Sequence, residues 1–312
     1  MVNQQSMQYR SALANNSCTF ADYLGLGASL YIPASRKDLT QCVNSPPISS
    51  LRSVIFCLED AIAHHQVPQA ISHIEQMLAT ELPMLNKFIR PRSPRVLAQI
   101  LKMDGIEQLQ GVVLPKINEE SLKEYGDILA MKPHLKVMPT LETSLAFSRN
   151  ELRHLREIIG QFSNPILCIR IGANDLFALL GLKRARQRTV YEGPLRAVID
   201  DIILSFKPFG YHVAAPVYDY LDDQYTLTRE VVTDTEYGLW TKTAIHPKQV
   251  DMIESQYQVC IDDYIMAEAI ISETAPAVFQ LNGQMCEPCV HHPWAEQTLF
   301  RAQAFGVQSV EK

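Results

Sequence analysis

Short apolar runs alternate with helical segments along most of this chain, and this alternation is the strongest constraint on its fold. Amphipathic helices are predicted over 144–160, where leucine and isoleucine recur at helical spacing, and over 191–206. Eight runs have the composition of strands: 27–33, 53–58, 86–90, 111–116, 136–142, 165–171, 210–216 and 238–245. Strands and helices that alternate eight times predict an α/β fold, a (β/α)₈ barrel.

An open, doubly wound sheet is the main alternative to the barrel. It would normally carry a glycine-rich phosphate turn after an early strand, and none is present here. We therefore divide the chain into a polar N-terminal tail (1–23), a barrel (24–256) and a C-terminal helical extension (257–312). The extension contains two helical segments joined by 279–285, and we expect it to pack on the barrel or on a neighbouring subunit.

The composition is that of an ordinary globular chain, and it excludes several kinds of partner. The 312 residues carry 28 basic and 34 acidic side chains, a net charge of −6 that suggests neither a nucleic acid nor a membrane as partner. No apolar stretch approaches membrane-spanning length, and the start lacks the order of a signal peptide. Seven cysteines, among them Cys57 and Cys168 inside apolar runs, indicate buried thiols in a reducing compartment. We expect a cytoplasmic location.

The run 165–171 leads through a Gly-Ala-Asn turn to one acid, Asp175. A near-continuous apolar run is typical of a strand buried on both faces, as in parallel sheets. An acid at the carboxyl end of such a strand lies where α/β barrels keep their chemistry. Asp175 could equally cap the helix that follows, and this stretch alone leaves both interpretations open.

Charged residues recur at the carboxyl ends of the other predicted strands. Buried charges have to be paired or coordinated, so this recurrence favours a functional site over a purely structural one. Glu142 and Asp175, on neighbouring strands, are predicted to share one Mg²⁺ or Mn²⁺. Arg90 offers a planar fork for a substrate carboxylate. The complete set is Glu59, Asp60, Arg90, Lys116, Glu142, Asp175, Asp219 and His246, with Lys242 nearby.

Seven segments in this order resemble the citrate lyase β-subunit-like family, which belongs to the phosphoenolpyruvate/pyruvate-type barrels and includes the HpcH/HpaI aldolases. The resemblance covers about residues 27–290 and is closest to the C–C bond lyases associated with tellurite-resistance operons. The segments are 28–34 (ASLYIPA), 58–61 (LEDA), 89–90 (IR), 113–116 (VLPK), 141–143 (LET), 172–176 (GANDL) and 242–249 (KTAIHPKQ).

The resemblance implies Mg²⁺ held by Glu142 and Asp175, with Arg90 gripping the carboxylate or carbonyl end of the substrate. It also implies an acid near the C-terminus that reaches the site of a neighbouring subunit, and Glu287 stands at that position. Two departures bear on the substrate. Cys57 replaces the acid that usually precedes Leu-Glu-Asp, and the segment 64–73 lacks the expected basic residues. A coenzyme A thioester therefore stays open as substrate.

Several local patterns have competing interpretations. Lys116 is either an ion-pair partner of the acids or a substrate contact, and Glu59 and Asp60 either orient a water at the metal or cap a helix. Ala173 and Asn174 are expected to line the substrate site. His246, followed by a proline, is assigned a structural role at a helix start.

Two clusters are weaker candidates. The pair Cys286 and Cys289, with His291 and His292 nearby, invites a zinc site, but a second separated pair is missing and we favour a metal-free segment. A basic run after Asp175 either binds a phosphate above the barrel mouth or forms a solvated face, and we favour the face. Its members are Lys183, Arg184, Arg186 and Arg188.

We therefore predict a Mg²⁺-dependent C–C bond lyase or aldolase that acts on a 2-oxo acid or an acyl thioester. Its metal would stabilise an enolate, and Glu287 or a water oriented by Glu59 would act as the base. A homo-oligomer, a trimer or a hexamer, is expected. Two alternatives remain: a non-catalytic scaffold on the same barrel, and a phosphotransfer or hydrolytic member of the pyruvate-binding barrels.

Overall fold

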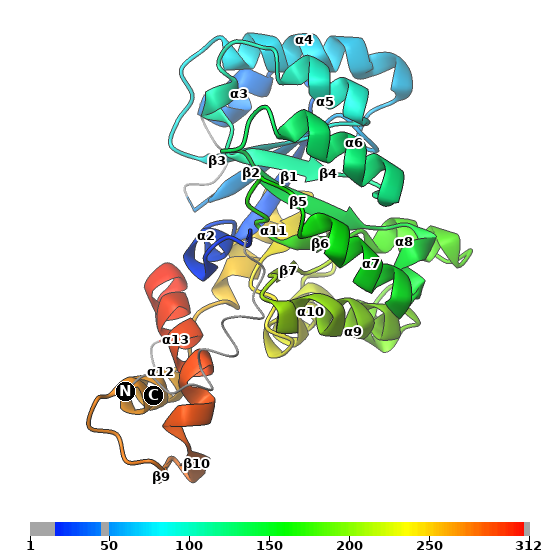
Figure 1. The fold of residues 1–312 in the computed structure, drawn as a ribbon. Coiled ribbons are helices and arrows are strands. Elements are labelled where there is room, and N and C mark those ends of the chain that lie inside the picture. The colour runs from blue at the N-terminus through cyan, green and yellow to red at the C-terminus, as the bar shows by residue number, and fades with distance from the viewer. Residues whose placement is uncertain (1–15, 45–49, 309–312) are drawn as a thin grey trace.

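The computed structural model describes residues 16–44 and 50–308, and eight parallel strands form its centre (Figure 1). The strands are β1 (Ala28–Pro33), β2 (Ser53–Cys57), β3 (Asn86–Arg90), β4 (Gly111–Leu114), β5 (Lys136–Leu141), β6 (Ile169–Ile171), β7 (Val213–Ala214) and β8 (Lys242–Ala244). They pair in sequence order, with β8 beside β1. The Ala215 N–H donates to the Thr241 carbonyl at 2.8 Å and joins β7 to β8. The predicted (β/α)₈ barrel is confirmed.

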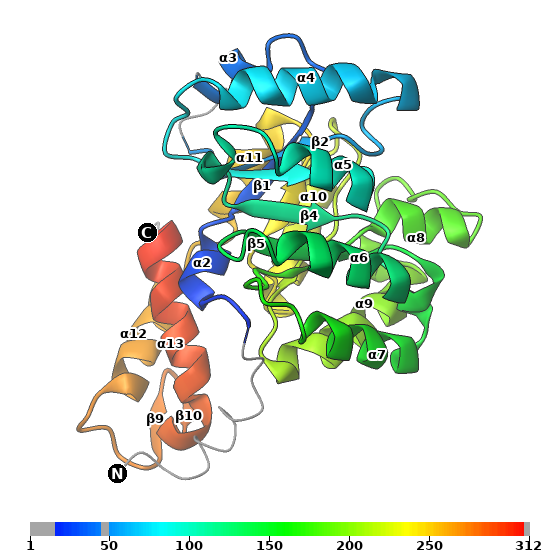
Figure 2. The same cartoon turned by 45° about the horizontal axis from the view of Figure 1, so that its top comes forward.

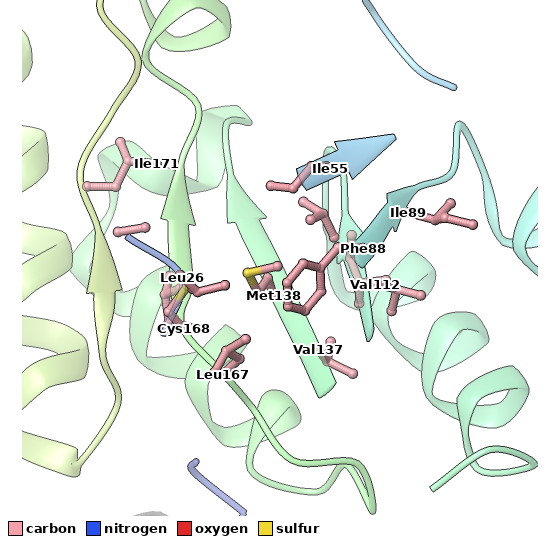
Figure 3. Close-up of a cluster of buried hydrophobic side chains, with 14 of the residues drawn as sticks. Leu26, Ile55, Phe88, Ile89, Val112, Val137, Met138, Leu167, Cys168 and Ile171 are labelled. Atoms are coloured by element: carbon pink, nitrogen blue, oxygen red, sulfur yellow. The ribbon is translucent and has the colours of Figure 1, made fainter. Parts of the chain in front are cut away.

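The strands are buried on both faces, which explains their continuous apolar composition. All five residues of β2 and all four of β4 are buried. Side chains from several strands meet in one core, shown in Figure 3, where Phe88 of β3 and Met138 of β5 lie close to each other. The packing of these side chains fixes where each strand ends, and therefore the positions of the residues that follow each strand.

Helices surround the sheet on its outer face (Figures 1 and 2). They are α3 (Leu39–Asn44), α4 (Val67–Leu78), α5 (Pro94–Ile100), α6 (Glu119–Leu129), α7 (Arg149–Ile159), α8 (Ala173–Leu179), α9 (Leu195–Phe206), α10 (Gln224–Glu236) and α11 (Pro247–Ser255). Short 3₁₀ helices cover His64–Gln66, Ile106–Gln108, Ser144–Phe147, Val190–Glu192 and Lys207–Phe209. The predicted helix 144–160 is divided because Ser148 caps α7 by accepting from the Glu151 N–H. None of the helices in the described ranges is both long and apolar enough to cross a membrane.

The predicted polar tail is wrong for its last eight residues, while residues 1–15 lie outside the described part. Asn16 accepts the Ile166 N–H at 2.6 Å through its backbone carbonyl. Thr19 then caps α2 (Phe20–Leu24), in which Tyr23 is buried. The polar composition of this segment gave no signal for the short helix α2, which packs at the amino-terminal ends of β7 and β8.

The C-terminal extension forms an arm built from α12 (Ile261–Ile271), β9 (Phe279–Leu281), β10 (Gln284–Cys286) and α13 (Pro288–Phe305). One end of α13 packs on the barrel, where the Arg301 guanidinium stacks 3.4 Å above the Trp240 ring. In addition, the Ala304 carbonyl accepts from Arg52 at 2.6 Å. Figures 1 and 2 show the hairpin β9–β10 at the other end of the arm, away from the barrel.

The Tyr23 hydroxyl links three segments at the amino-terminal end of the barrel, and its removal should weaken the fold. It accepts from the Trp240 N–H at 2.8 Å and donates to the Val213 carbonyl at 2.5 Å. Tyr23→Phe leaves both backbone groups unpaired, and we expect a loss of about 1–3 kcal/mol of unfolding free energy in urea titrations. Tyr264→Phe, which removes an exposed hydroxyl bound to Glu268, is the control and should change stability by about 0.5 kcal/mol or less. Equal losses would contradict this assignment.

Candidate active site

Arg90 ends strand β3 and connects two buried carboxylates at the mouth of the barrel. Its Nη2 atom lies 3.0 Å from Glu59 Oε2 and 2.8 Å from Glu142 Oε1. All three residues are buried, so each charge needs the others to offset its desolvation. Burial raises the pKa of Glu142 to about 7, although the charge of Arg90 opposes that shift.

Lys116 brings a second cation into this cluster. Its ammonium lies 2.8 Å from Glu59, 2.9 Å from Asp60 and 3.4 Å from Asp175. Burial lowers the pKa of Lys116, but the hydrogen bonds that its ammonium donates to Glu59 and Asp60 outweigh this effect and hold that pKa above its ordinary value. Lys116 was predicted to be either an ion-pair partner of the acids or a substrate contact, and the structure shows the ion pairs.

The backbone of Lys116 takes part as well. This residue has a φ of +46°, in the left-handed region that non-glycine residues rarely adopt. In this conformation its N–H donates to Glu142 Oε1 at 2.7 Å. Strained backbone of this kind persists where the surroundings fix it, and it is concentrated at functional sites.

Glu142 follows strand β5 and packs tightly against the end of β6. A Cβ on Gly172 would lie 2.2 Å from Glu142 Oε2, so only glycine fits beside this carboxylate. Glu142 Oε2 and Arg90 Nε are both buried, and neither has a hydrogen-bond partner among the described residues. Two buried polar atoms of this cluster are therefore left for a ligand to satisfy.

Asp175 lies in the first turn of α8, a favourable place for a negative charge. The N-cap of this helix is Gly172, so the interpretation of Asp175 as the cap is wrong. Its side chain is 30% exposed and points its Oδ1 at Lys116. The structure thus brings Glu142 and Asp175 to the same cluster, as predicted from their strands.

The donor set at this cluster is made of carboxylate oxygens, the ligands that Mg²⁺ and Mn²⁺ prefer. The described part of the chain contains no group of three or more His, Cys, Asp or Glu residues arranged to hold a metal. A cation between Glu142 and Asp175 would therefore take its other ligands from water or substrate, as Mg²⁺ commonly does. The unpaired Glu142 Oε2 fits that role.

Other predicted residues lie at the edge of this cluster or outside it. Asn174 is exposed and donates to Asp219 at 3.1 Å, and Ala173 is buried in the first turn of α8. Glu287 lies in the arm, directly after β10 and before α13. Because α13 has 18 residues, about 27 Å of helix separate Glu287 from the end that packs on the barrel. Glu287 therefore does not join the site of its own chain.

Lys242 and Arg184 belong to a separate, fully buried network. Lys242 Nζ lies 2.9 Å from Glu230 and 2.8 Å from Asp234, both on α10. Arg184 Nη1 lies 2.6 Å from Glu230. The expected place of Lys242 near the site and the solvated face expected for Arg184 are wrong, because both side chains are buried against carboxylates of α10.

The remaining members of the basic run are exposed, and Arg186 pairs with Asp222. The structural role of His246 is confirmed, since it caps α11 and its Nδ1 accepts from the Lys248 N–H at 3.1 Å. In the arm, Cys286 packs in a small apolar core, while Cys289 is exposed. The His291 ring accepts the Glu287 N–H at 3.1 Å.

Sequence reasoning assigned no role to two residues that shape the site. Arg92 donates to the backbone carbonyls of Glu59 and Ile62 at 2.5 and 2.7 Å and so braces the segment that carries Glu59 and Asp60. Gly172 gives Glu142 its space. For Arg92 the available signal was a charged residue shortly after a strand. For Gly172 it was a glycine directly before Ala-Asn-Asp.

A cavity of about 490 Å³ lies at the ends of β1 and β8. Its lining is largely apolar and includes Tyr31, Pro33 and Ile245. Its charged lining residues, Arg36 and Asp38, pair with each other at 2.7 Å.

Replacing Gly172 should disturb the site by steric overlap alone, since its φ of −91° suits any residue. We expect Gly172→Ala to displace Glu142 and to lower the free energy of unfolding by about 1–3 kcal/mol, measured by thermal denaturation. Gly193→Ala is the matched control, because the nearest atom to its added Cβ is 3.9 Å away. A Gly172→Ala protein as stable as the control would disprove the tight contact with Glu142.

Comparison with known proteins agrees with this fold. A (3S)-malyl-CoA thioesterase of Cereibacter sphaeroides (ATCC 17029) is 23% identical over 291 residues, 89% of this chain and 94% of that protein. The Mycobacterium tuberculosis protein CitE, solved with magnesium, acetoacetate and coenzyme A, has a TM-score of 0.66 at 24% identity and covers 90% of this chain and 99% of its own. A citrate lyase of Burkholderia xenovorans LB400 has a TM-score of 0.73 at 15% identity, over 97% of both chains.

One family matches almost the whole chain. It is described as the C–C bond lyases of the TIM-barrel fold, and the match spans residues 21–307. This range contains all eight strands, the charged cluster at their carboxyl ends and the arm. The protein therefore belongs to the C–C bond lyase family of TIM-barrel enzymes.

Proposed function

We propose that this protein is a Mg²⁺-dependent lyase or aldolase that breaks or forms a C–C bond next to the enolate of a 2-oxo acid. One observation carries the proposal. Glu142 directly follows β5, Asp175 lies in the helix turn that follows the neighbouring β6, and Glu142 Oε2 is buried without a hydrogen-bond partner among the described residues. Bound there, Mg²⁺ would stabilise the negative charge that develops on the substrate oxygen as the bond breaks.

Arg90 is our candidate for holding the carboxylate of the substrate. Its Nη2 is fixed by Glu59 and Glu142, while its buried Nε lacks a partner in the described ranges. A guanidinium that is already oriented loses little entropy when it binds a second carboxylate. Lys116, 44% exposed, adds positive charge at the same entrance.

An acyl thioester of coenzyme A is the second candidate substrate. The relative from C. sphaeroides is named a malyl-CoA thioesterase, and CitE was solved with coenzyme A. The largely apolar cavity beside β1 and β8 offers room for an uncharged acyl or thioester arm. Arg36 lines this cavity but is already paired with Asp38, so its charge is not available to an anionic ligand. We therefore favour the free 2-oxo acid.

Mg²⁺ binding tests the proposal directly. In calorimetric titrations of the wild type we expect binding that pyruvate or oxaloacetate strengthens, because the oxo acid supplies further ligands. Asp175→Ala should weaken Mg²⁺ binding about tenfold or more, since one of two carboxylates is lost. Asp104→Ala, which removes an exposed acid elsewhere, is the control and should bind as the wild type does.

The result also separates the alternatives. If neither the wild type nor the variant binds Mg²⁺, the lyase proposal fails and a non-catalytic scaffold is the better hypothesis. Binding without aldol cleavage, but with turnover of a phosphorylated 2-oxo acid or of a thioester, would select the phosphotransfer or hydrolytic alternative. A link to tellurite resistance stays a prediction.

We further propose that Glu287 acts as the base in the site of a second copy of this chain. It lies too far along the arm to reach its own site. Apolar side chains are exposed near Glu287, such as Met285 and Val290, and also beside Asp175, such as Leu179 and Leu182. Burial of such groups against each other would hold the arm of one subunit at the mouth of the next. A water oriented by Glu59 is the alternative base.

The oligomeric mass tests this arrangement. We expect the wild type to form a trimer or a hexamer, and Met285→Asp combined with Val290→Asp to be monomeric, because a charge at each position opposes apolar burial. Light scattering coupled to gel filtration measures both. Met84→Asp, at a fully exposed position outside the arm, should keep the wild-type mass. A monomeric wild type, or a double variant of unchanged mass, would contradict the proposal.

A further inference from the structure

Arg170 is a charged residue in the middle of the buried strand β6 and is only 2% exposed. Its Nη2 donates to Thr243 Oγ1 at 2.5 Å, and its Nη1 lies 3.7 Å from the Met138 sulfur. Its Cζ is 5.6 Å from the centre of the Tyr31 ring. These contacts come from β8, β5 and β1, so the guanidinium lies inside the barrel.

This cation has no counter-ion among residues 16–44 and 50–308. Its side-chain contacts are to the Thr243 hydroxyl, the Met138 thioether, the Cys168 thiol and the Tyr31 ring, and no carboxylate of the described residues lies within 4.0 Å. By contrast, the buried cations Arg90, Arg184 and Lys242 each pair with a carboxylate. Arginine keeps its proton in proteins, so the charge of Arg170 has to be offset from outside its own strand.

An unsatisfied hydroxyl lies beside this cation. Thr140 of β5 is the register partner of Arg170, is buried, and its Oγ1 has no hydrogen-bond partner within the described part. Thr140 shares its strand face with Met138 and Glu142, two residues before and after it. An oxyanion would satisfy the guanidinium and the hydroxyl together, because both can donate to it.

The depth of this pair matches a second acid group of a small substrate. Thr140 precedes Glu142 by two residues, which places it about 7 Å further back along β5, toward the barrel interior, at 3.3 Å per residue. Three C–C bonds of about 1.5 Å separate the carboxyl carbons of a four-carbon dicarboxylate, and the carboxylate oxygens extend this reach. Tyr31, which lines the cavity at the mouth, is also the ring that Arg170 faces.

We propose that Arg170 and Thr140 form a second anion subsite, which selects substrates that carry a carboxylate at each end. This inference rests on the proposed function, since the first carboxylate is placed by the site of Glu142, Asp175 and Arg90. The subsite makes Arg170 a specificity residue. A substrate with one carboxylate leaves Arg170 without a counter-ion.

Two stable 2-hydroxy acids test the subsite. Malate and lactate share the end that would bind at Mg²⁺, and they differ by the second carboxylate. In calorimetric titrations at saturating Mg²⁺ we expect the wild type to bind malate about tenfold more tightly than lactate, or better, as for a hydrogen bond to a charged group. Arg170→Met should abolish this preference and leave lactate binding unchanged. Arg170→Lys should retain part of it.

Thr140→Val provides a second variant whose outcome does not depend on the charge. We expect it to weaken malate binding about threefold or more while it leaves lactate binding unchanged, since it removes one hydrogen bond to the anion. Without ligand it should be as stable as the wild type or more so, because it removes an unsatisfied buried hydroxyl. If Arg170→Met does not fold, Thr140→Val and Arg170→Lys decide the question.

Equal losses of malate and lactate binding in the variants would show that Arg170 has a structural role and would overturn the subsite. A wild type without preference for malate would overturn it too. If neither acid binds the wild type in the presence of Mg²⁺, the proposed function fails. The subsite is then tested separately on the metal-free protein. Succinate should then raise the melting temperature of the wild type more than that of Arg170→Met, and equal shifts would overturn the inference.

Discussion

The ion pairs of Arg90 with Glu59 and Glu142 are the interaction on which the mouth of the barrel depends. They tie together the ends of β2, β3 and β5, and Lys116 extends them to Asp175 across the mouth. Removing any one partner would leave an uncompensated buried charge, which is strongly destabilising. The strands supply the rigid frame, because these residues lie at or shortly after the carboxyl ends of strands that are buried on both faces.

Two networks of buried charge share this barrel, and they differ in one respect. Around Lys242, every carboxylate oxygen of Glu230 and Asp234 has a hydrogen-bond partner from the chain itself. At the mouth, Glu142 Oε2 has none among the described residues. Carboxylates whose oxygens are all paired within the chain stabilise the packing of α10 on the barrel, whereas an unpaired carboxylate oxygen has capacity for a ligand. The two networks therefore differ in the pairing of their carboxylate oxygens, although Arg184 Nε is also buried without a hydrogen-bond partner among the described residues.

The length of α13 keeps Glu287 away from the active-site cluster of its own chain. Glu287 and the barrel contacts of Arg301 lie toward opposite ends of α13. The small apolar core around Cys286 holds the hairpin at the outer end. The same helix that anchors the arm therefore also carries its acid away from the barrel mouth.

The sequence by itself determined the strand order, the exact bounds of β3 and the gathering of Arg90, Lys116, Glu142 and Asp175. These follow from local periodicity and from the rule that parallel strands end at one edge, and neither needs knowledge of distant partners. Only the tertiary structure decided the burial of Arg184 and Lys242, the packing of residues 16–24 and the isolation of Arg170. The burial of Arg184 and the packing of Tyr23 depend on partners far away in the chain, Glu230 and Val213. The burial of Lys242 depends on how α10 packs against the barrel, and the isolation of Arg170 depends on which side chains of β1, β5 and β8 surround it. Such partners leave no periodic signal in the segment itself, because a charge or a polar run has the same local pattern whether its partner is water or a buried acid.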